Sequence, residues 1–445
     1  MNETLINIGL AVTQILFTFA LGFYLITCLQ WFSYKFERVL FHFTRPLWHV
    51  FFLIVPIVLF YGAERFFVIL ALAVIASYAV YLATQHRVNL GVVLPLVVSF
   101  ALSFLLEKAK FKTYENSARK KLASMPELKI IMITASFGKT SIKNFLFELL
   151  KNDFACRKTP RSVNTLAGLI QDVNNELAAG TQIYIAEAGA RLKGDIAQIT
   201  EFLNPQIAIV GEIGAQHIEY FKTLENIRAT KLEALGSKRL EKAFVHSSTQ
   251  ANEGTKIEIY DKNLSGVEAS LDGVKFKLGE REFASPLLGK FNAANLAVCV
   301  KTALYLGLDE ARIASALSRL KNVEHRLERI DAGGKIIIDD GFNGNFNGMS
   351  ASYELVGSYE GRKVLVTPGI MESSDEENEK LSKIINKTFD IVMLTSSLNA
   401  VALLKHLSRP KVIVIKDKSK MQEALTQNTK AGDLILFSND APSFM

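Results

Sequence analysis

Residues 127–141 read ELKIIMITASFGKTS, and this stretch decides the fold. Glu127–Thr134 form an apolar run of strand length, and a short polar loop with one glycine follows. Lys139–Lys151 then carry apolar side chains at helical spacing, which predicts a helix with one buried face. A buried strand that passes through a short loop into a helix is the building unit of a parallel α/β sheet.

The loop itself has the features of a phosphate cradle. Backbone N–H groups at a helix N-terminus bind anions, and Gly138 lets a ligand approach the backbone closely. Lys139 is expected to neutralise phosphate charge, and the Thr140 hydroxyl is expected to bind Mg²⁺. The plain alternative is an ordinary strand-to-helix turn with a solvated lysine. Ala135 stands where such loops usually begin with glycine, so we expect a loop conformation that alanine accepts. The predicted ATP-binding loop comprises Ala135, Ser136, Phe137, Gly138, Lys139, Thr140 and Ser141.

Strand-like and helix-like segments keep alternating after this loop. Gln182–Glu187 and Gln206–Val210 read as further strands with helices between them, which predicts a parallel sheet covered on both faces. Residues 255–285 hold short strands and turn signals, which predict a small antiparallel excursion. A helix pair is expected near 291–320.

A second alternating series begins after His325–Arg326, and it predicts a second α/β domain. Its expected strands are Lys335–Asp340, Lys363–Thr367, Asp390–Leu394, Lys411–Ile415 and Asp433–Phe437.

The N-terminal quarter has a different composition from the rest. It contains few charged side chains and several long apolar runs, which predict a transmembrane helical region over residues 1–107. The alternative is a buried helical core. A cleaved signal peptide does not fit, because Met1–Glu3 is not basic. The apolar runs cover about 5–29, 47–61, 66–84 and 89–106.

Basic residues give conflicting signals about the orientation of these runs. Lys35, Arg38 and Arg45 place the first loop in the cytoplasm and the N-terminus outside. Four spans would then put the C-terminal part outside, yet the basic linker 108–124 favours the inside. An interfacial run at 47–61 would leave three spans, and the sequence leaves the number of spans open.

Overall composition excludes several protein classes. The chain has 445 residues, of which 49% are hydrophobic and 21% charged, so it is neither disordered nor a small disulfide-stapled protein. Its net charge of +7 is mild, and no basic block requires a nucleic-acid partner. Three separated cysteines without a CxxC motif argue against a zinc site or a disulfide framework, and they fit a reducing compartment.

Several segments in order resemble the Mur ligases, which build the peptide stem of peptidoglycan. Thr134–Ser141 resembles their TGSNGKTT loop, and Asp339–Met349 (DDGFNGNFNGM) is similar to the DDSYNANPxSM signature of the branch that adds D-alanyl-D-alanine. Phe291 replaces the usual histidine of the G-x-HNxxN element. The other matching segments are Thr159–Thr165, Ala186–Ala190, Val210–Phe221, Arg228–Glu233 and Leu288–Leu296.

This resemblance implies a central ATP-binding Mur ligase domain over 125–324 and a Rossmann-like C-terminal domain over 325–445. The predicted membrane region occupies the place of the small N-terminal domain that holds the UDP end of the substrate in the family. The contacts to UDP are therefore the part of the family pattern that this chain does not reproduce.

The resemblance also implies roles for single residues. The Mg²⁺ ligands would be Thr140, Glu187, His217 and Lys231, the last of these as a carbamate. Lys139, His217, Lys231 and Arg326 would be catalytic. Asn292 and Asn295 would contact adenine, although asparagines at a helix start are also common caps. Arg326 and Asp340 would reach the nucleotide. The substrate-binding residues would be Thr159, Asn164, Thr165, Asn343 and Asn345.

The activity that the resemblance implies is ATP- and Mg²⁺-dependent joining of D-alanyl-D-alanine to UDP-N-acetylmuramoyl-tripeptide through an acyl phosphate. The expected location is the bacterial inner membrane, with the catalytic domains facing the cytoplasm and with membrane lipid and membrane-bound peptidoglycan enzymes as partners. One alternative is another ligase of the superfamily, acting on a lipid-linked or poly-glutamyl acceptor. The other is a non-catalytic, membrane-anchored nucleotide-binding scaffold.

Overall fold

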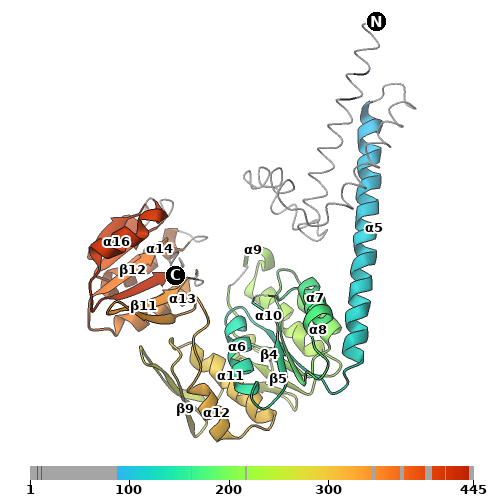
Figure 1. The fold of residues 1–445 in the computed structure, drawn as a ribbon, viewed down its shortest axis with the longest axis horizontal. Helices are drawn as coiled ribbons and strands as arrows, with labels where there is room; N and C mark the ends of the chain where they lie inside the picture. The colour runs from blue at the N-terminus through green and yellow to red at the C-terminus, as the bar shows by residue number, and fades with distance from the viewer. Residues whose placement is uncertain are drawn as a thin grey trace. The chain divides into compact units, whose positions relative to one another are not determined.

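The computed structural model describes residues 88–161, 163–215, 218–341, 344, 346–370, 375–395, 403–415 and 417–439, together with Ile8 and Val12. Contacts divide the chain into two units, Met1–Ala118 and Arg119–Met445. Both α/β sheets belong to the second unit (Figure 1).

A parallel six-stranded sheet forms the central domain, in the order β2-β3-β1-β4-β5-β6. The chain leaves β1 in one direction toward β2 and later leaves β4 in the other direction toward β5. The strand order therefore reverses between β1 and β4, and ligands of such sheets bind at the carboxyl ends of the strands at this point. The strands are β1 (Lys129–Thr134), β2 (Cys156–Lys158), β3 (Ile183–Glu187), β4 (Ile207–Val210), β5 (Lys242–Val245) and β6 (Ile257–Ile259).

Helices cover both faces of this sheet, as the alternation predicted (Figure 1). Ile131 and Ile133 of β1 face the core that α6 and α11 share. Met132, between them, points to the other face and contacts Thr200 of α8. The helices are α6 (Lys139–Leu150), α7 (Leu166–Glu176), α8 (Asp195–Leu203), α9 (Ile218–Phe221), α10 (Leu224–Leu232), α11 (Asn292–Tyr305) and α12 (Glu310–Leu317), with 3₁₀ turns η1 (Glu233–Gly236) and η2 (Ser247–Thr249).

The antiparallel excursion expected over 255–285 is confirmed from Leu264 onward and packs on α11, whereas β6, in the same range, pairs parallel with β5 in the central sheet. Strands β7 (Leu264–Ser270), β8 (Gly273–Leu278) and β9 (Arg281–Ser285) form a separate three-stranded sheet. Phe276 and Phe283 of this sheet join the same apolar core as α6 and α11. The excursion therefore holds α11 against the helix that starts at the predicted phosphate loop.

The second α/β domain has a six-stranded sheet in the order β10-β11-β15-β12-β13-β14. Only β10 is antiparallel to its neighbour among these described strands. The sheet lies between two apolar cores, one with α13 and α14 and the other with α16. The elements are β10 (Glu328–Ala332), β11 (Lys335–Asp340), α13 (Phe346–Gly357), β12 (Lys363–Thr367), α14 (Asp375–Thr388), β13 (Ile391–Leu394), β14 (Lys411–Val414), η3 (Lys418–Lys420), α16 (Met421–Asn428) and β15 (Leu434–Ser438).

A single long helix, α5 (Val88–Ala123), leads into the central domain. The expected basic linker 108–124 is thus helical up to Ala123, because it contains no glycine or proline and has charge pairs one turn apart, such as Lys112 and Glu115 at 3.0 Å. Near its end, Arg119 donates to the Glu201 carbonyl and lies over the Phe202 ring. At least one basic side chain of the linker, which the sequence analysis used to infer membrane orientation, therefore contacts the central domain.

Among the residues that the structure describes, no helix has the length and apolar content that a membrane crossing needs. The transmembrane region predicted for 1–107 is therefore not borne out in that part of the chain, where the run 89–106 forms the first half of α5. The predicted runs 5–29, 47–61 and 66–84 lie outside the described residues.

Candidate active site

The predicted phosphate loop connects β1 to α6 at the point where the strand order reverses. Gly138 is the residue before the helix and has φ +79°, a left-handed conformation that favours glycine. Ala135 does not have a positive φ, so this loop does not need glycine at its first position. The departure from the family pattern at Ala135 is thus compatible with a phosphate-binding turn.

There is no room for a side chain at Gly138. A Cβ atom at this position would lie 2.5 Å from Oδ1 of Asn295, closer than packed atoms approach. Asn295 is held there because its amide donates to Asn292 Oδ1 at 3.1 Å, and Asn292 donates to the Leu288 carbonyl at 2.7 Å. Neither asparagine caps α11 through its side chain, since Phe291 occupies the cap position. Of the two predicted adenine contacts, Asn295 therefore lies against the phosphate loop, and Asn292 holds it there.

Lys139 is folded over the loop. Its ammonium donates to the carbonyl oxygens of Ala135 at 2.7 Å and Ser136 at 3.0 Å. Burial lowers the pKa of Lys139 to about 8, while Glu187 opposes this shift and Arg326 adds to it. The side chain is thus still mainly charged at neutral pH, and it is positioned to meet a phosphate at the helix N-terminus.

Glu187 lies at the carboxyl end of β3, next to the phosphate helix. It is 1% exposed, and its Oε2 accepts a hydrogen bond from Thr140 Oγ1 at 3.0 Å. Oε1 accepts from the Asn164 amide at 3.1 Å. A hydroxyl and a carboxylate thus lie within hydrogen-bond distance of each other beside the phosphate loop. Both are oxygen ligands of the kind that Mg²⁺ prefers.

The donor set fits Mg²⁺ bound together with phosphate. Among the described residues, no group of three or more His, Cys, Asp or Glu side chains forms a metal site. Mg²⁺ is commonly held by one or two carboxylates, several waters and substrate phosphates, so Thr140 and Glu187 suffice as the protein side of such a site. His217, the other predicted ligand, lies outside the described residues.

Lys231 of α10 is buried near this group. It is 4% exposed, and burial lowers its pKa to about 7. The Lys139 charge adds to this shift, whereas Asp195, Glu187 and Glu233 oppose it. Burial thus favours the neutral amine of Lys231, and only the neutral amine can react with CO₂ to form a carbamate.

The loop between β2 and α7 supports Glu187 from the other side. Thr159 is fully buried and its hydroxyl accepts from the Glu187 N–H at 3.2 Å. Thr165 caps α7 by accepting from Gly168 N. Asn164 also accepts a backbone bond from Gly189 through its carbonyl. The structure therefore places Thr159 and Asn164 against Glu187, while Thr165 fixes the start of α7.

Arg326 is presented by a tightly bonded turn. The flanking residues His325 and Leu327 have positive φ values of 60° and 53°. Asn322 donates to the carbonyls of Arg326 and Leu327, and Leu327 N donates to Asp340 Oδ1 at 3.3 Å. Asp340 thus holds the turn, while Arg326 is near enough to lower the pKa of Lys139.

His325 is held by Asp339 near the end of β11. Its Nδ1 lies 2.6 Å from Asp339 Oδ2, and this hydrogen bond raises the pKa of His325. Sequence reasoning missed this contact and the role of Asn322. The predicted substrate residues Asn343 and Asn345 lie outside the described residues.

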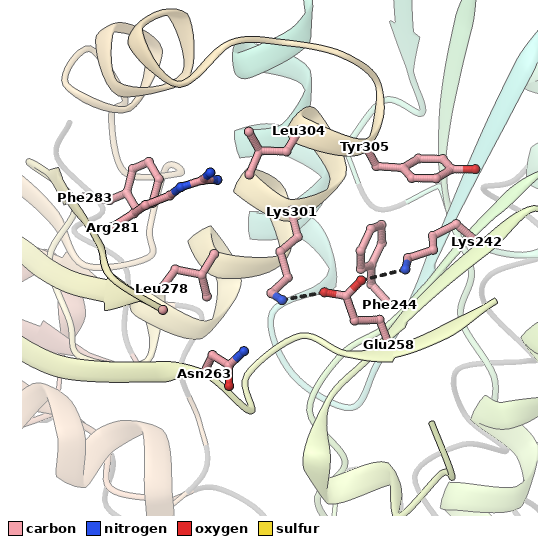
Figure 2. Close-up of a pocket in the computed structure, with 11 residues that line it drawn as sticks. Lys242, Phe244, Glu258, Asn263, Leu278, Arg281, Phe283, Lys301, Leu304 and Tyr305 are labelled. Atoms are coloured by element: carbon pink, nitrogen blue, oxygen red, sulfur yellow. Dashed lines mark hydrogen bonds and ion pairs between the residues drawn. The ribbon is translucent and has the colours of Figure 1, made fainter. Parts of the chain in front are cut away.

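A separate hollow of about 400 Å³ lies at the opposite end of α11 (Figure 2). Tyr305 at its rim is ten residues beyond Asn295, which is about 15 Å along a helix. Glu258 pairs with both Lys242 and Lys301 there, at 2.6 and 2.5 Å. One carboxylate thus pairs with two lysines there, and none of the residues that line the hollow belongs to the phosphate loop.

Comparison with known proteins agrees with this arrangement. The Mur ligase middle domain family matches residues 133–303, which include the phosphate loop, Glu187, Lys231 and Asn295. The UDP-N-acetylmuramoyl-tripeptide–D-alanyl-D-alanine ligase of Bacillus subtilis (strain 168) is 29% identical over 334 residues, which cover 69% of this chain and 72% of the relative. The central part of the chain is therefore similar to the Mur ligases.

Two further Mur ligases extend the comparison. The enzyme of the same name from Borreliella burgdorferi is 29% identical over 271 residues, covering 57% of this chain and 54% of the relative. The MurF ligase from Thermotoga maritima, solved in complex with ADP, has 26% sequence identity and a TM-score of 0.64. That match covers 74% of this chain and 80% of the MurF chain. The Mur ligase similarity thus extends beyond the middle domain.

Substituting Gly138 by alanine tests the phosphate cradle of this chain. We expect a fall in ADP affinity of at least about ten-fold, because the new Cβ must displace Asn295 and the left-handed backbone is strained by roughly 1–2 kcal/mol. Gly180→Ala is the matched control, since Gly180 has φ +89° with nothing within 4 Å of its Cβ position. Titration calorimetry with ADP and Mg²⁺ measures the difference. Equal ADP affinity in both variants would contradict a cradle at Gly138.

Proposed function

We propose that this chain is an ATP-dependent ligase that joins D-alanyl-D-alanine to UDP-N-acetylmuramoyl-tripeptide in peptidoglycan precursor synthesis. The observation that carries the proposal is the phosphate loop with Lys139, Thr140 and Glu187 gathered at one helix N-terminus. The names of the B. subtilis and B. burgdorferi relatives supply the substrates.

The reaction activates a carboxylate, which is otherwise a poor electrophile. A carboxylate oxygen of the tripeptide attacks the γ-phosphorus of ATP, so that an acyl phosphate forms and ADP leaves. The amine of D-alanyl-D-alanine then attacks the acyl carbon, loses a proton, and expels inorganic phosphate. Charge moves onto phosphate oxygens in both steps, so electrostatic stabilisation and positioning are the main requirements.

The residues near the loop match these requirements. Lys139 neutralises charge on the β- and γ-phosphates, and Arg326 adds a second cation. Thr140, Glu187 and, if carbamylated, Lys231 would hold Mg²⁺, which would supply positive charge to the phosphates. His217 is proposed as a further ligand from the sequence resemblance alone.

The remaining assignments concern the substrates. Asn292 and Asn295 are proposed to contact adenine, and Asp340 to meet the nucleotide. Asn164, which donates to Glu187, is proposed to bind the acceptor substrate as well. Thr159 and Thr165 are proposed to hold the loop that carries it. Asn343 and Asn345 are proposed to lie near the amine substrate.

Amine-dependent ADP release tests the proposed activity. Full-length protein in detergent or lipid should release ADP only when UDP-N-acetylmuramoyl-tripeptide and D-alanyl-D-alanine are both present. Stimulation by glutamate with a poly-glutamyl acceptor, or by a lipid-linked acceptor, would indicate another ligase of the superfamily. ADP binding without turnover on any of these substrates would indicate a scaffold and contradict the enzyme.

We also propose that residues 1–107 hold the ligase at the inner membrane with its catalytic domains in the cytoplasm. The support is the composition of this region, which has long apolar runs between few charges. We expect the intact chain to remain with membranes after a carbonate wash, and a chain that starts at residue 108 to be released. Release of the intact chain by carbonate would contradict anchoring. Membrane lipid, and membrane-bound enzymes that use the product, are the proposed partners.

A further inference from the structure

Lys143 is a buried cation that the proposed reaction does not use. It lies on α6 one turn after Lys139, and its side chain is 1% exposed. Its neighbours on the buried face of the helix include Ile142 and Leu146, which belong to the apolar core. Placing a charge in such surroundings is strongly unfavourable unless the charge is paired, so the contacts of Lys143 need an explanation.

The partner of Lys143 is the proposed metal ligand. Its Nζ lies 3.1 Å from Glu187 Oε2, the same oxygen that accepts from Thr140, and both paired side chains are at most 2% exposed. Glu187 is therefore held by two donors from α6, one turn apart, and by Asn164 from the loop that follows β2. The carboxylate has a full set of partners without any metal ion.

Lys143 also fixes the loop that carries Asn164. Its ammonium donates to the carbonyl oxygen of Arg161, a non-glycine residue with φ +42°. Such a backbone is strained and persists only where surrounding contacts hold it. The Lys143 ammonium, which extends from the phosphate helix α6, therefore contacts both Glu187 and the Arg161 carbonyl in the loop after β2.

We propose that Lys143 is a positioning residue: it acts as a built-in counter-ion that holds Glu187 and the described residues of the loop after β2 (159–161 and 163–165) in their working arrangement before Mg²⁺ and nucleotide arrive. This inference rests on the proposed function, because it takes Glu187 as a metal ligand. A preformed carboxylate spares the site from reorganising when the nucleotide binds. Mg²⁺ without nucleotide should then bind Glu187 only weakly, because the Lys143 ammonium already lies beside this carboxylate.

The proposal predicts that removing Lys143 makes the fold respond to Mg²⁺. In Lys143→Met, Glu187 is left buried without its counter-ion, which should lower the melting temperature by roughly 5–15 °C in the absence of metal. Millimolar Mg²⁺ without nucleotide should then recover part of that loss, whereas it should leave the wild-type melting temperature nearly unchanged. Removing the charge as well, in Lys143→Met with Glu187→Gln, should restore much of the stability and abolish the response to Mg²⁺.

Lys158→Met is the matched control. Lys158 is half-buried beside the same helix and donates to Asn144 at 2.6 Å, yet it does not contact Glu187. Its variant should melt at the same temperature with and without Mg²⁺. Calorimetry or circular dichroism of the full chain provides the measurement.

Three results would overturn the proposal. They are a Lys143→Met variant with a wild-type response to Mg²⁺, a double variant no more stable than Lys143→Met, and a Mg²⁺ response in Lys158→Met as large as that in Lys143→Met. If Lys143→Met is insoluble, a soluble double variant supports the counter-ion role and an insoluble one contradicts it. None of these readouts uses the peptide substrates, so failure of the proposed ligase activity would be recognised separately, by ADP release from the wild type.

Discussion

Lys139→Ala is expected to lower kcat for amide formation by about a thousand-fold. The Lys139 ammonium is the cation that folds over the phosphate loop, and it can leave the Ala135 and Ser136 carbonyls to meet phosphate oxygens without rebuilding the loop. Its loss removes charge neutralisation exactly where negative charge must move between ATP and the carboxylate. ADP release and amide formation, measured together at saturating substrates, give the effect.

The control for this variant lies on the same helix. Lys151→Ala removes an exposed lysine that pairs with Glu148 at the end of α6, and it should leave kcat within about two-fold, since exposed ion pairs contribute little. The far-ultraviolet circular dichroism of both variants should match the wild type. Product formation by Lys139→Ala at the rate of Lys151→Ala would exclude the loop as the site of phosphoryl transfer.

Lys231→Ala is expected to lower kcat by about a hundred-fold or more, because it removes the proposed carbamate ligand. A direct consequence concerns pH. Burial lowers the pKa of Lys231 to about 7, so the neutral amine that CO₂ attacks increases as pH rises through 7 and is scarce at pH 6. Activity in CO₂-depleted buffer should therefore fall, most of all near pH 6, and bicarbonate should restore it.

Lys238→Ala provides the comparison, because Lys238 is exposed and follows η1, the turn that comes directly after α10. It should retain both the activity and the bicarbonate response of the wild type. Wild-type activity that is indifferent to CO₂ at every pH, together with full activity of Lys231→Ala, would rule out a carbamate at this position.

Much of the fold was predictable from the pattern of apolar residues. The predicted strands Lys335–Asp340 and Lys363–Thr367 are confirmed with the same ends, because each is an apolar run closed by polar residues. Strand β2 was missed because it is only three residues long and reads CRK. Strand β10 was missed because its sequence, ERIDA, is polar and pairs antiparallel at the edge of the sheet.

The part of the candidate site that lies at strand ends was predictable from the same pattern of apolar residues. The phosphate loop and Glu187 follow directly from strand ends, and the structure brings them together. Lys143 was missed because a lysine on a helix is usually solvated, and only the packing of β3 against α6 shows that it is buried. The turn around Arg326 depends on left-handed residues at His325 and Leu327, which no residue type signals there.

The most direct test of carboxylate activation follows the oxygen atoms. UDP-N-acetylmuramoyl-tripeptide labelled with ¹⁸O in its terminal carboxylate should be incubated with ATP, Mg²⁺, D-alanyl-D-alanine and the intact ligase, and the released phosphate analysed by mass spectrometry. The account predicts one ¹⁸O atom in each phosphate released with product, because the carboxylate oxygen that attacked ATP leaves with the phosphate. Product formation with unlabelled phosphate would contradict an acyl phosphate and with it the proposed reaction.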